Sequence, residues 1–143
     1  MARKEEYRKH KGSSGNNRKT GEVFLAQNAQ KPEVIETGSG LQYIIIDKTE
    51  GECPNEFSEI VMQQRVLLLN GTILEDSYKQ NKAVEAKVSE LLEGLCEGIQ
   101  LMPVGSRFKF WLPPELAWGK KGSSDRIPPN SVIQFDIRLT EIK

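Results

Sequence analysis

A stretch near the C-terminus alternates between apolar and polar residues. Its apolar residues are Ile133, Phe135, Ile137 and Leu139, and they alternate with Gln134, Asp136, Arg138 and Thr140. Because successive side chains of a β-strand point to opposite faces, this period of two predicts a strand with one buried face. Half-buried strands are typical of antiparallel sheets, so the chain must supply further strands and an element that covers the apolar face.

Three other segments have the composition of strands. The stretches "LQYIIIDK" (41–48) and "SRFKFWL" (106–112) are rich in β-branched and aromatic residues. In "EIVMQQRVLLLNGTILEDS" (59–77), the Asn70-Gly71 dipeptide suits the positive φ angles of a tight turn and predicts a hairpin. Gln64 falls on the apolar face of the first hairpin strand, and an inward polar side chain needs a partner or a role.

One segment, 89–102, has the period of a helix. Its apolar residues recur at intervals of four, four and three, as Leu91, Leu95, Ile99 and Met102. Ser89 is the expected N-cap, and Glu90 and Glu93 lie where the helix dipole favours negative charge. The sequence therefore predicts an α+β fold, in which an antiparallel sheet of about five strands is covered by one short α-helix.

The N-terminal part differs from the rest in charge. Residues 1–20 contain seven Lys or Arg against Glu5 and Glu6, in a chain whose net charge is zero. We expect residues 1–20 to be a disordered basic arm, 21–35 to be a short helical or docking segment, and 36–143 to be the folded domain. The basic arm is interpreted as a solubilising tail in preference to a contact for nucleic acid or the ribosome.

The titratable residues exclude several kinds of chemistry. His10 is the only histidine and lies in the basic arm, which removes Ser-His and Cys-His catalysis and histidine-based metal sites. Cys53 and Cys96 are 43 residues apart, which fits neither a disulfide framework nor a metal site. We therefore expect free thiols, no metal and no cofactor.

The apolar runs are short throughout the chain. The run "VLLL" at 66–69 is far from the length that spans a bilayer, and no apolar stretch of a secretory signal follows the basic N-terminus. Together with the free thiols, these features predict a cytoplasmic protein that does not bind membranes. We also expect a monomer, because no dimerisation helix precedes the domain.

A proline-rich connection, "WLPPELAWGKKGSSDRIPPNS" (111–131), separates the last two predicted strands. It contains four prolines, and Trp118 lies in its middle beside Gly119. A long loop in a small domain is usually functional or disordered, and a disordered loop rarely contains tryptophan. We interpret this connection as part of a binding site.

Residues 36–143 resemble the FKBP-type peptidyl-prolyl isomerases, particularly the bacterial branch related to macrophage infectivity potentiator proteins. The resemblance rests on "SGLQYIII", "NGTILEDSY", "LLEGLCEGIQLMPVGSRFKFWLPPELAWG" and "IPPNSVIQFDIRLTEI", in this order and spacing. It implies an FKBP-like fold with a strongly curved sheet. It also implies an enzyme that isomerises X-Pro bonds in polypeptide clients, with macrolides as candidate ligands.

The same resemblance implies an apolar cleft for the proline ring. Leu95 takes the place of a tryptophan floor, Leu91 and Leu92 form an aliphatic wall, and the Leu92 backbone N–H donates to a substrate carbonyl. Phe135 and Ile127 keep the residue types of the family at two further wall positions.

Other cleft positions depart from the family. Trp118 replaces a tyrosine, and Leu74-Glu75 replaces a phenylalanine-aspartate pair. Gln64 replaces an inward tyrosine, and Ala86 is expected to replace a phenylalanine in the strand before the helix. Such a diverged active site would bury less of a proline ring, so we expect weak activity.

Simpler interpretations remain open from the sequence alone. Leucines at helical spacing and an inward Phe135 are also what an ordinary core contains, and Glu75-Asp76 is also what two solvated charges after a strand look like. The isomerase is the leading hypothesis, and the alternative is a non-catalytic peptide-binding module or chaperone, which Gln64 and Ala86 support.

Overall fold

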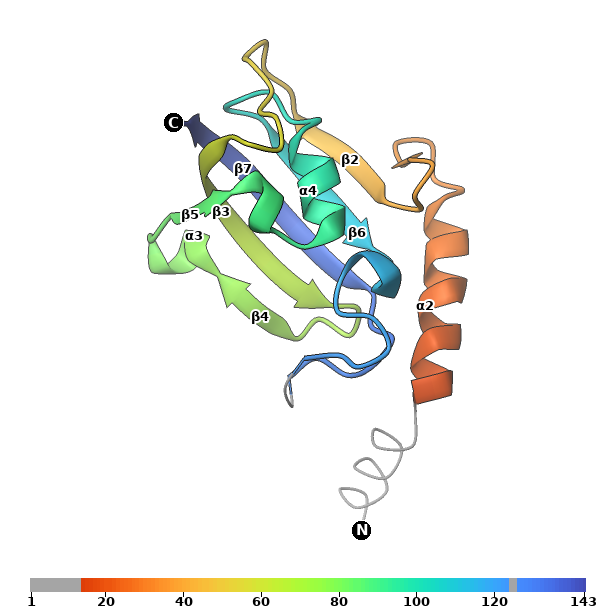
Figure 1. Cartoon of the computed structure of the whole chain (residues 1–143). Coiled ribbons are helices and arrows are strands. Elements are labelled where there is room, and N and C mark those ends of the chain that lie inside the picture. The colour runs from red at the N-terminus through yellow and green to blue at the C-terminus, as the bar shows by residue number, and fades with distance from the viewer. Residues whose placement is uncertain (1–13, 124–125) are drawn as a thin grey trace.

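The computed structural model describes residues 14–123 and 126–143, which form one antiparallel sheet with helices packed against it (Figure 1). The strands are β1 (Ile35–Glu36), β2 (Gln42–Asp47), β3 (Glu59–Leu68), β4 (Ile73–Asp76), β5 (Val84–Lys87), β6 (Arg107–Leu112) and β7 (Ile133–Ile142). They lie in the order β1-β2-β6-β7-β3-β4, and β5 pairs with β3. The predicted α+β architecture is confirmed, and the short strands β1 and β5 add to the five strands predicted.

Helices and helical turns lie between these strands. They are α2 (Ser14–Asn28), α3 (Ser77–Gln80) and α4 (Glu93–Ile99), with 3-10 turns η1 (Val88–Glu90) and η2 (Pro114–Leu116). Figure 1 shows α4 lying across one face of the sheet, whereas α2 stands beside its β2 and β6 side. The sheet bends around α4, and its register shifts at three places on β2 and β3, which is how bulges curve a sheet.

Strand β7 confirms the alternation from which its existence was predicted. Its four alternating apolar residues from Ile133 to Leu139 are at most 2% exposed, whereas the residues between them are half-buried. Phe110 of β6 pairs with Phe135 of β7, and Val66 of β3 pairs with Phe135 from the other side. The apolar faces of these three central strands therefore form one side of the core, and α4 closes it.

The predicted hairpin is present as β3 and β4, but its turn is wider than expected. The backbone N–H of Leu68 donates to Thr72 O over 3.0 Å, and β4 begins only at Ile73. Of the Asn70-Gly71 pair, only Gly71 adopts a positive φ, of 91°. The Asn70 side chain instead accepts the backbone N–H of Thr72 over 3.0 Å, a local turn that takes the place of a two-residue connection.

The predicted start of the helix at Ser89 is wrong. Ser89 lies in η1, where its backbone N–H donates to Glu56 O over 2.9 Å, and α4 begins at Glu93 after Leu92. Leu91 is extended, with ψ of 167°, so it separates the two helical pieces. Pairing with the 52–58 loop holds Ser89 away from α4, and a local capping pattern gives no sign of such a distant contact.

Helix α2 begins earlier than the predicted boundary at residue 21. Residues 14–20 are helical and are not part of a disordered arm, whereas residues 1–13, including His10, lie outside the described residues. The Asn17 side chain donates to Pro129 O over 2.6 Å, and the Phe24 ring lies 6.3 Å from the Trp111 ring. The anchors of this helix are largely polar, so its apolar periodicity is weak and sequence patterning missed its first turns.

Further expectations concern the thiols and the membrane. Cys53 and Cys96 are free thiols, as predicted. Within the described residues, no helix combines the length and apolarity needed to cross a bilayer, and no three His, Cys, Asp or Glu side chains are grouped as a metal site would need.

We predict that Gly94→Ala destabilises the fold, because α4 packs directly on β6 at this position. A Cβ on Gly94 would lie 2.5 Å from Leu112 Cγ and 3.2 Å from Leu116 Cβ. We expect the free energy of unfolding, measured by urea denaturation, to fall by about 1–2 kcal/mol, since overpacking outweighs the better helix propensity of alanine. The matched control is Gly38→Ala, whose added Cβ has no atom within 4 Å. Equal unfolding midpoints for the two variants would contradict the prediction.

Candidate active site

A cavity of about 380 Å³ opens between α4, the β3–β4 hairpin and the loop before β7. It brings together all nine residues predicted for the site, namely Gln64, Leu74, Glu75, Leu91, Leu92, Leu95, Trp118, Ile127 and Phe135. Most of these side chains are apolar, and they come from six separate elements or loops of the chain. A cavity with an apolar lining and few polar groups is the usual form of a site for a small apolar group.

The apolar walls follow from the local structure of two elements. The break between η1 and α4 leaves Leu91 and Leu92 extended and half-buried, so that they face the cavity, and Leu95 follows one turn into α4 with 3% exposure. On the sheet side, Phe135 of β7 is 2% exposed and pairs with Val66 of β3, which also lines the cavity. These residues therefore belong to the core and line the cavity at the same time.

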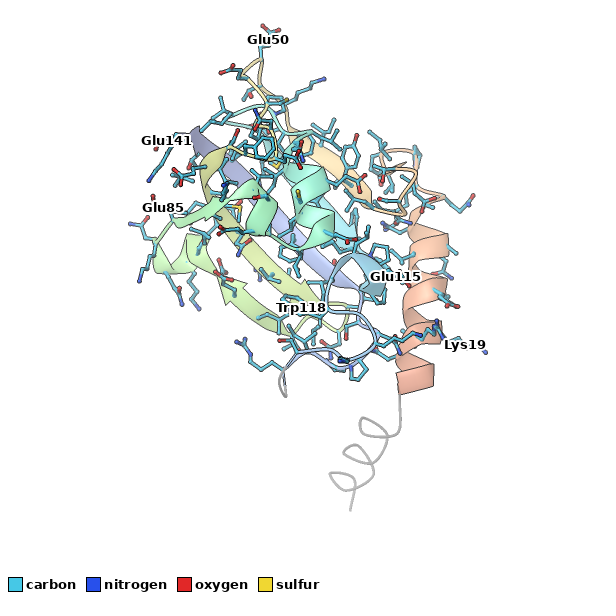
Figure 2. All side chains as sticks on the ribbon, viewed as in Figure 1. Lys19, Glu50, Glu85, Glu115, Trp118 and Glu141 are labelled. Atoms are coloured by element: carbon cyan, nitrogen blue, oxygen red, sulfur yellow. The ribbon has the colours of Figure 1, made fainter. Side chains whose placement is uncertain are left out.

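The proline-rich loop between β6 and β7 forms the rim of the cavity. It begins with η2, and its two sides are joined where the Asn130 N–H donates to Gly119 O over 2.8 Å. Ser123 and Ile127 pair as an isolated bridge, which brings Ile127 back to the cavity. Figure 2 marks Trp118 in this loop, below α4. The loop is thus folded back on itself, and both of its predicted site residues reach the same cavity.

Val84, and not Ala86, lines the cavity from β5. Both residues are half-buried on the same face of β5, but Ala86 lines a separate hollow beside Lys143. The expectation for Ala86 was wrong because Val84 and Ala86 lie on the same face of β5. The sequence does not show which of the two faces the cavity, since the register of β5 on β3 decides it. In that register Val84 pairs with Met62, another cavity residue, whereas Ala86 pairs with the fully buried Ile60.

Sequence reasoning missed several further lining residues. These are Met62, Val66, Val84, Glu90 and Arg126. Met62 and Val66 share the inward face of β3 with Gln64, so the same period of two could have identified them. Arg126 could not be identified in this way, because it reaches the cavity through loop geometry, with its guanidinium donating to Leu74 O over 2.6 Å.

Two polar groups of the cavity come from the hairpin. The Gln64 side chain is 8% exposed, and its Nε2 donates to Glu75 Oε2 over 3.0 Å. The backbone N–H of Gln64 donates to Ser77 Oγ over 2.7 Å, which ties β3 to the start of α3. Gln64 therefore has the partner that an inward polar residue requires, for one of its two amide atoms.

One backbone donor of the cavity is unused. The N–H of Leu92, which the family resemblance assigns to a substrate carbonyl, has no acceptor within hydrogen-bond distance among the described residues. Leu92 caps α4 without a side-chain hydrogen bond of its own. A free backbone N–H beside an apolar wall can bind and orient a carbonyl group.

Comparison with known proteins identifies the family. The profile for FKBP-type peptidyl-prolyl cis-trans isomerase matches residues 51–140, and the profile for the domain amino-terminal to such isomerases matches residues 1–45. The chain belongs to the FKBP-type peptidyl-prolyl isomerase family. The amino-terminal profile ends inside β2, so the match to that domain extends into the first strands of the sheet.

Individual relatives agree with this assignment. A probable FKBP-type isomerase, FkpA, from Neisseria meningitidis serogroup B is 35% identical over 134 residues, which cover 94% of this chain and 49% of the relative. The outer membrane protein MIP of Legionella longbeachae is 34% identical and is covered to 54%. The crystal structure of FkpA from Escherichia coli superposes with a TM-score of 0.88 at 28% identity, covering 96% of this chain and 64% of that one. This FKBP-type chain thus spans about half the length of the two sequence relatives.

A group of charged residues lies on the opposite face of the sheet from the cavity. Arg107 Nη2 and Nε donate to the two carboxylate oxygens of Asp136 over 2.7 and 2.9 Å, and the Arg107 guanidinium lies 5.9 Å from the centre of the Tyr78 ring. Burial, reinforced by the negative charge of Asp136, raises the pKa of Tyr78 to about 12. The phenol therefore stays protonated in the folded FKBP-type domain at pH values where an exposed tyrosine ionises.

We predict a loss of stability at alkaline pH that depends on Tyr78. Its folded pKa is above the unfolded value of 10.0, so the unfolded chain releases this proton first and the free energy of unfolding falls between about pH 10 and 12. Urea denaturation of the parent and of Tyr78→Phe over this range measures the effect. The parent is expected to lose stability more steeply with pH than the variant, which has no phenol proton to release. Parallel pH profiles would contradict the prediction.

Proposed function

We propose that this chain is a peptidyl-prolyl cis-trans isomerase that acts on X-Pro bonds in polypeptides. The observation that carries the proposal is the cavity of the FKBP-type domain, in which an apolar lining is combined with the free N–H of Leu92. The proline ring matches the apolar lining, and a substrate carbonyl outside the X-Pro amide matches the N–H.

Such a cavity can lower the rotation barrier without a nucleophile or a proton transfer. The X-Pro amide resists rotation by about 18–20 kcal/mol because of its resonance. A twisted amide loses this resonance, and its carbonyl becomes less polar, so a poorly hydrated site favours it over the planar form. Leu91, Leu95 and Phe135 hold the ring in this scheme, while the Leu92 N–H holds the carbonyl and leaves the amide free to turn.

The activity is proposed to be weak, because the floor of the cavity is small. Leu95 stands where the family resemblance expects tryptophan, and the lining residue from β5 is the aliphatic Val84. An aliphatic floor buries less of the ring, and the loss of tens of Å² of apolar contact costs on the order of 1 kcal/mol at about 25 cal/mol per Å². This cost corresponds to roughly a tenfold lower rate.

Several finer expectations belong to this proposal. Proline-containing polypeptides are the proposed clients, and macrolides are proposed as ligands of the same cavity. The cytoplasmic location, the monomeric state and the role of the basic arm stay predictions. The Legionella relative carries an outer-membrane name, so fractionation of the producing cells is the direct test of the location.

The proposal is tested by exchange spectroscopy on an X-Pro peptide with catalytic amounts of the full chain. Faster cis-trans exchange than in the peptide alone is the expected result. A peptide that binds the cavity while its exchange stays at the uncatalysed rate would overturn the proposal and leave the alternative of a non-catalytic peptide-binding module.

We predict that Leu92→Pro lowers activity by about tenfold more than Leu92→Ala. Both variants lose the leucine side chain, but only proline removes the N–H that binds the carbonyl. The backbone suits proline, since φ of Leu92 is −52° and the preceding Leu91 is extended, and no hydrogen bond within the described residues is lost. Unfolding midpoints of the two variants serve as the control for folding. Equal exchange rates for two folded variants would show that this N–H plays no part.

A further inference from the structure

Gln64 lines the cavity, and one of its side-chain atoms has no hydrogen-bond partner within the described residues. Gln64 Oε1 is buried and accepts no hydrogen bond within the described part of the chain. The whole side chain is 8% exposed and projects from the inward face of β3, between two other lining residues, Met62 and Val66. A buried acceptor without a donor is rare in folded proteins, because it gives up its hydrogen bonds to water without replacing them.

The neighbours of Gln64 fix which amide atom is left unpaired. The Glu75 carboxylate accepts a hydrogen bond from Gln64 Nε2 over 3.0 Å, so the amide nitrogen of Gln64 faces Glu75. The backbone of Gln64 is held by β7 through its pairing with Ile137 and by Ser77 Oγ. Turning the amide over would place its oxygen against the carboxylate. The unpaired acceptor is therefore built into the site.

No described residue donates to Oε1, so a bound molecule can supply the donor. The proline ring of a substrate has no N–H or O–H within an X-Pro bond, so it cannot pair with Gln64 Oε1. The residue before proline enters the cavity together with the ring, because the amide that turns joins the two. Backbone N–H groups are common to all X-Pro segments, so only a side chain that carries a donor can make Oε1 discriminate between substrates, and the side chain of the residue before proline lies next to the ring.

The charges around the cavity favour one class of donor. Glu75 and Glu90 line it, and Arg126 is the one cation among the described lining residues, with its guanidinium bonded to Leu74 O on the hairpin. Glu75 binds directly to the Gln64 amide and strengthens Oε1 as an acceptor. An anionic side chain beside Gln64 would place a further acceptor against Gln64 Oε1 and the Glu75 carboxylate. A side chain with an N–H group would satisfy Oε1.

We propose that Gln64 determines the substrate specificity of this cavity, by accepting a hydrogen bond from an N–H-bearing side chain on the residue before proline. This inference rests on the proposed function. Asn-Pro segments are preferred over Leu-Pro and Asp-Pro segments, although the three side chains have nearly the same shape.

The test compares three peptides that differ only in Asn, Leu or Asp before proline. The parent chain and Gln64→Met are compared, since methionine keeps the length and volume of glutamine but lacks the acceptor. Both the exchange rate constant per enzyme concentration and the dissociation constant are measured for each peptide. The ratio of Asn-Pro to Leu-Pro is expected to be about fivefold higher for the parent than for the variant, as the loss of one hydrogen bond implies. Asp-Pro is expected to be the poorest of the three with the parent.

A purely structural role for Gln64 gives different results. Gln64→Met is expected to keep or raise the thermal unfolding midpoint, because it removes an unsatisfied buried acceptor, whereas a structural role predicts a lower midpoint and the same loss for all three peptides. Gln27→Met, at an exposed position on α2, is the matched control and should change no ratio.

The outcomes separate this inference from the proposed function. Catalysis of all three peptides with equal ratios in the parent and in Gln64→Met would overturn the role of Gln64 and leave the isomerase intact. Binding that prefers Asn-Pro through Gln64 but never accelerates exchange would support the inference for a binding module and overturn the isomerase.

Discussion

Strand β3 is the element on which the rest of the structure depends, because it hydrogen-bonds to three strands at once. Its ten residues pair with β7, with β4 and with β5, and register shifts at Val61/Met62 and Val66/Leu67 bend it between these partners. The period of two then divides its side chains. Inward residues build the core and one wall of the cavity, while outward Arg65 joins the charged group on the other face. A shift of one residue in the pairing register of β3 would exchange its inward and outward side chains.

The fold was predictable from the sequence wherever one local pattern decided the structure. The alternation of apolar and polar residues predicted β6 and β7 correctly, because it reflects a contact with the core that recurs along each strand. The Asn70-Gly71 dipeptide predicted the hairpin, because Gly71 readily adopts the positive φ of the turn. Patterning failed where a distant contact decided the outcome. The hydrogen bond from the Ser89 N–H to Glu56 O keeps Ser89 out of the helix. Hydrogen bonds between Asn17 and the loop before β7 hold the start of α2.

The candidate site was predictable for a different reason. Family resemblance aligned nine residues, and all nine line one cavity because the order and spacing of the matching segments resemble those of the family. Resemblance failed at β5, where the register on β3 places Val84 in the cavity and Ala86 beside Ile60. It also gave no account of hydrogen bonding. That Gln64 finds Glu75 for its nitrogen and nothing for its oxygen is visible only once both hairpin strands are placed in space.

The smaller walls of this cavity and its unpaired acceptor are linked. An aromatic lining binds the proline ring by area alone and is indifferent to whether the neighbouring residue carries a donor. With Leu95 and Val84 in the lining, less of the binding free energy comes from the ring, so a single hydrogen bond forms a larger share of what remains. Pairing a buried acceptor also discriminates more sharply than apolar contact, since a substrate without the donor leaves the acceptor unsatisfied. If the chain acts as proposed, reduced affinity for proline in general and stronger selection among X-Pro sequences follow from the same residues.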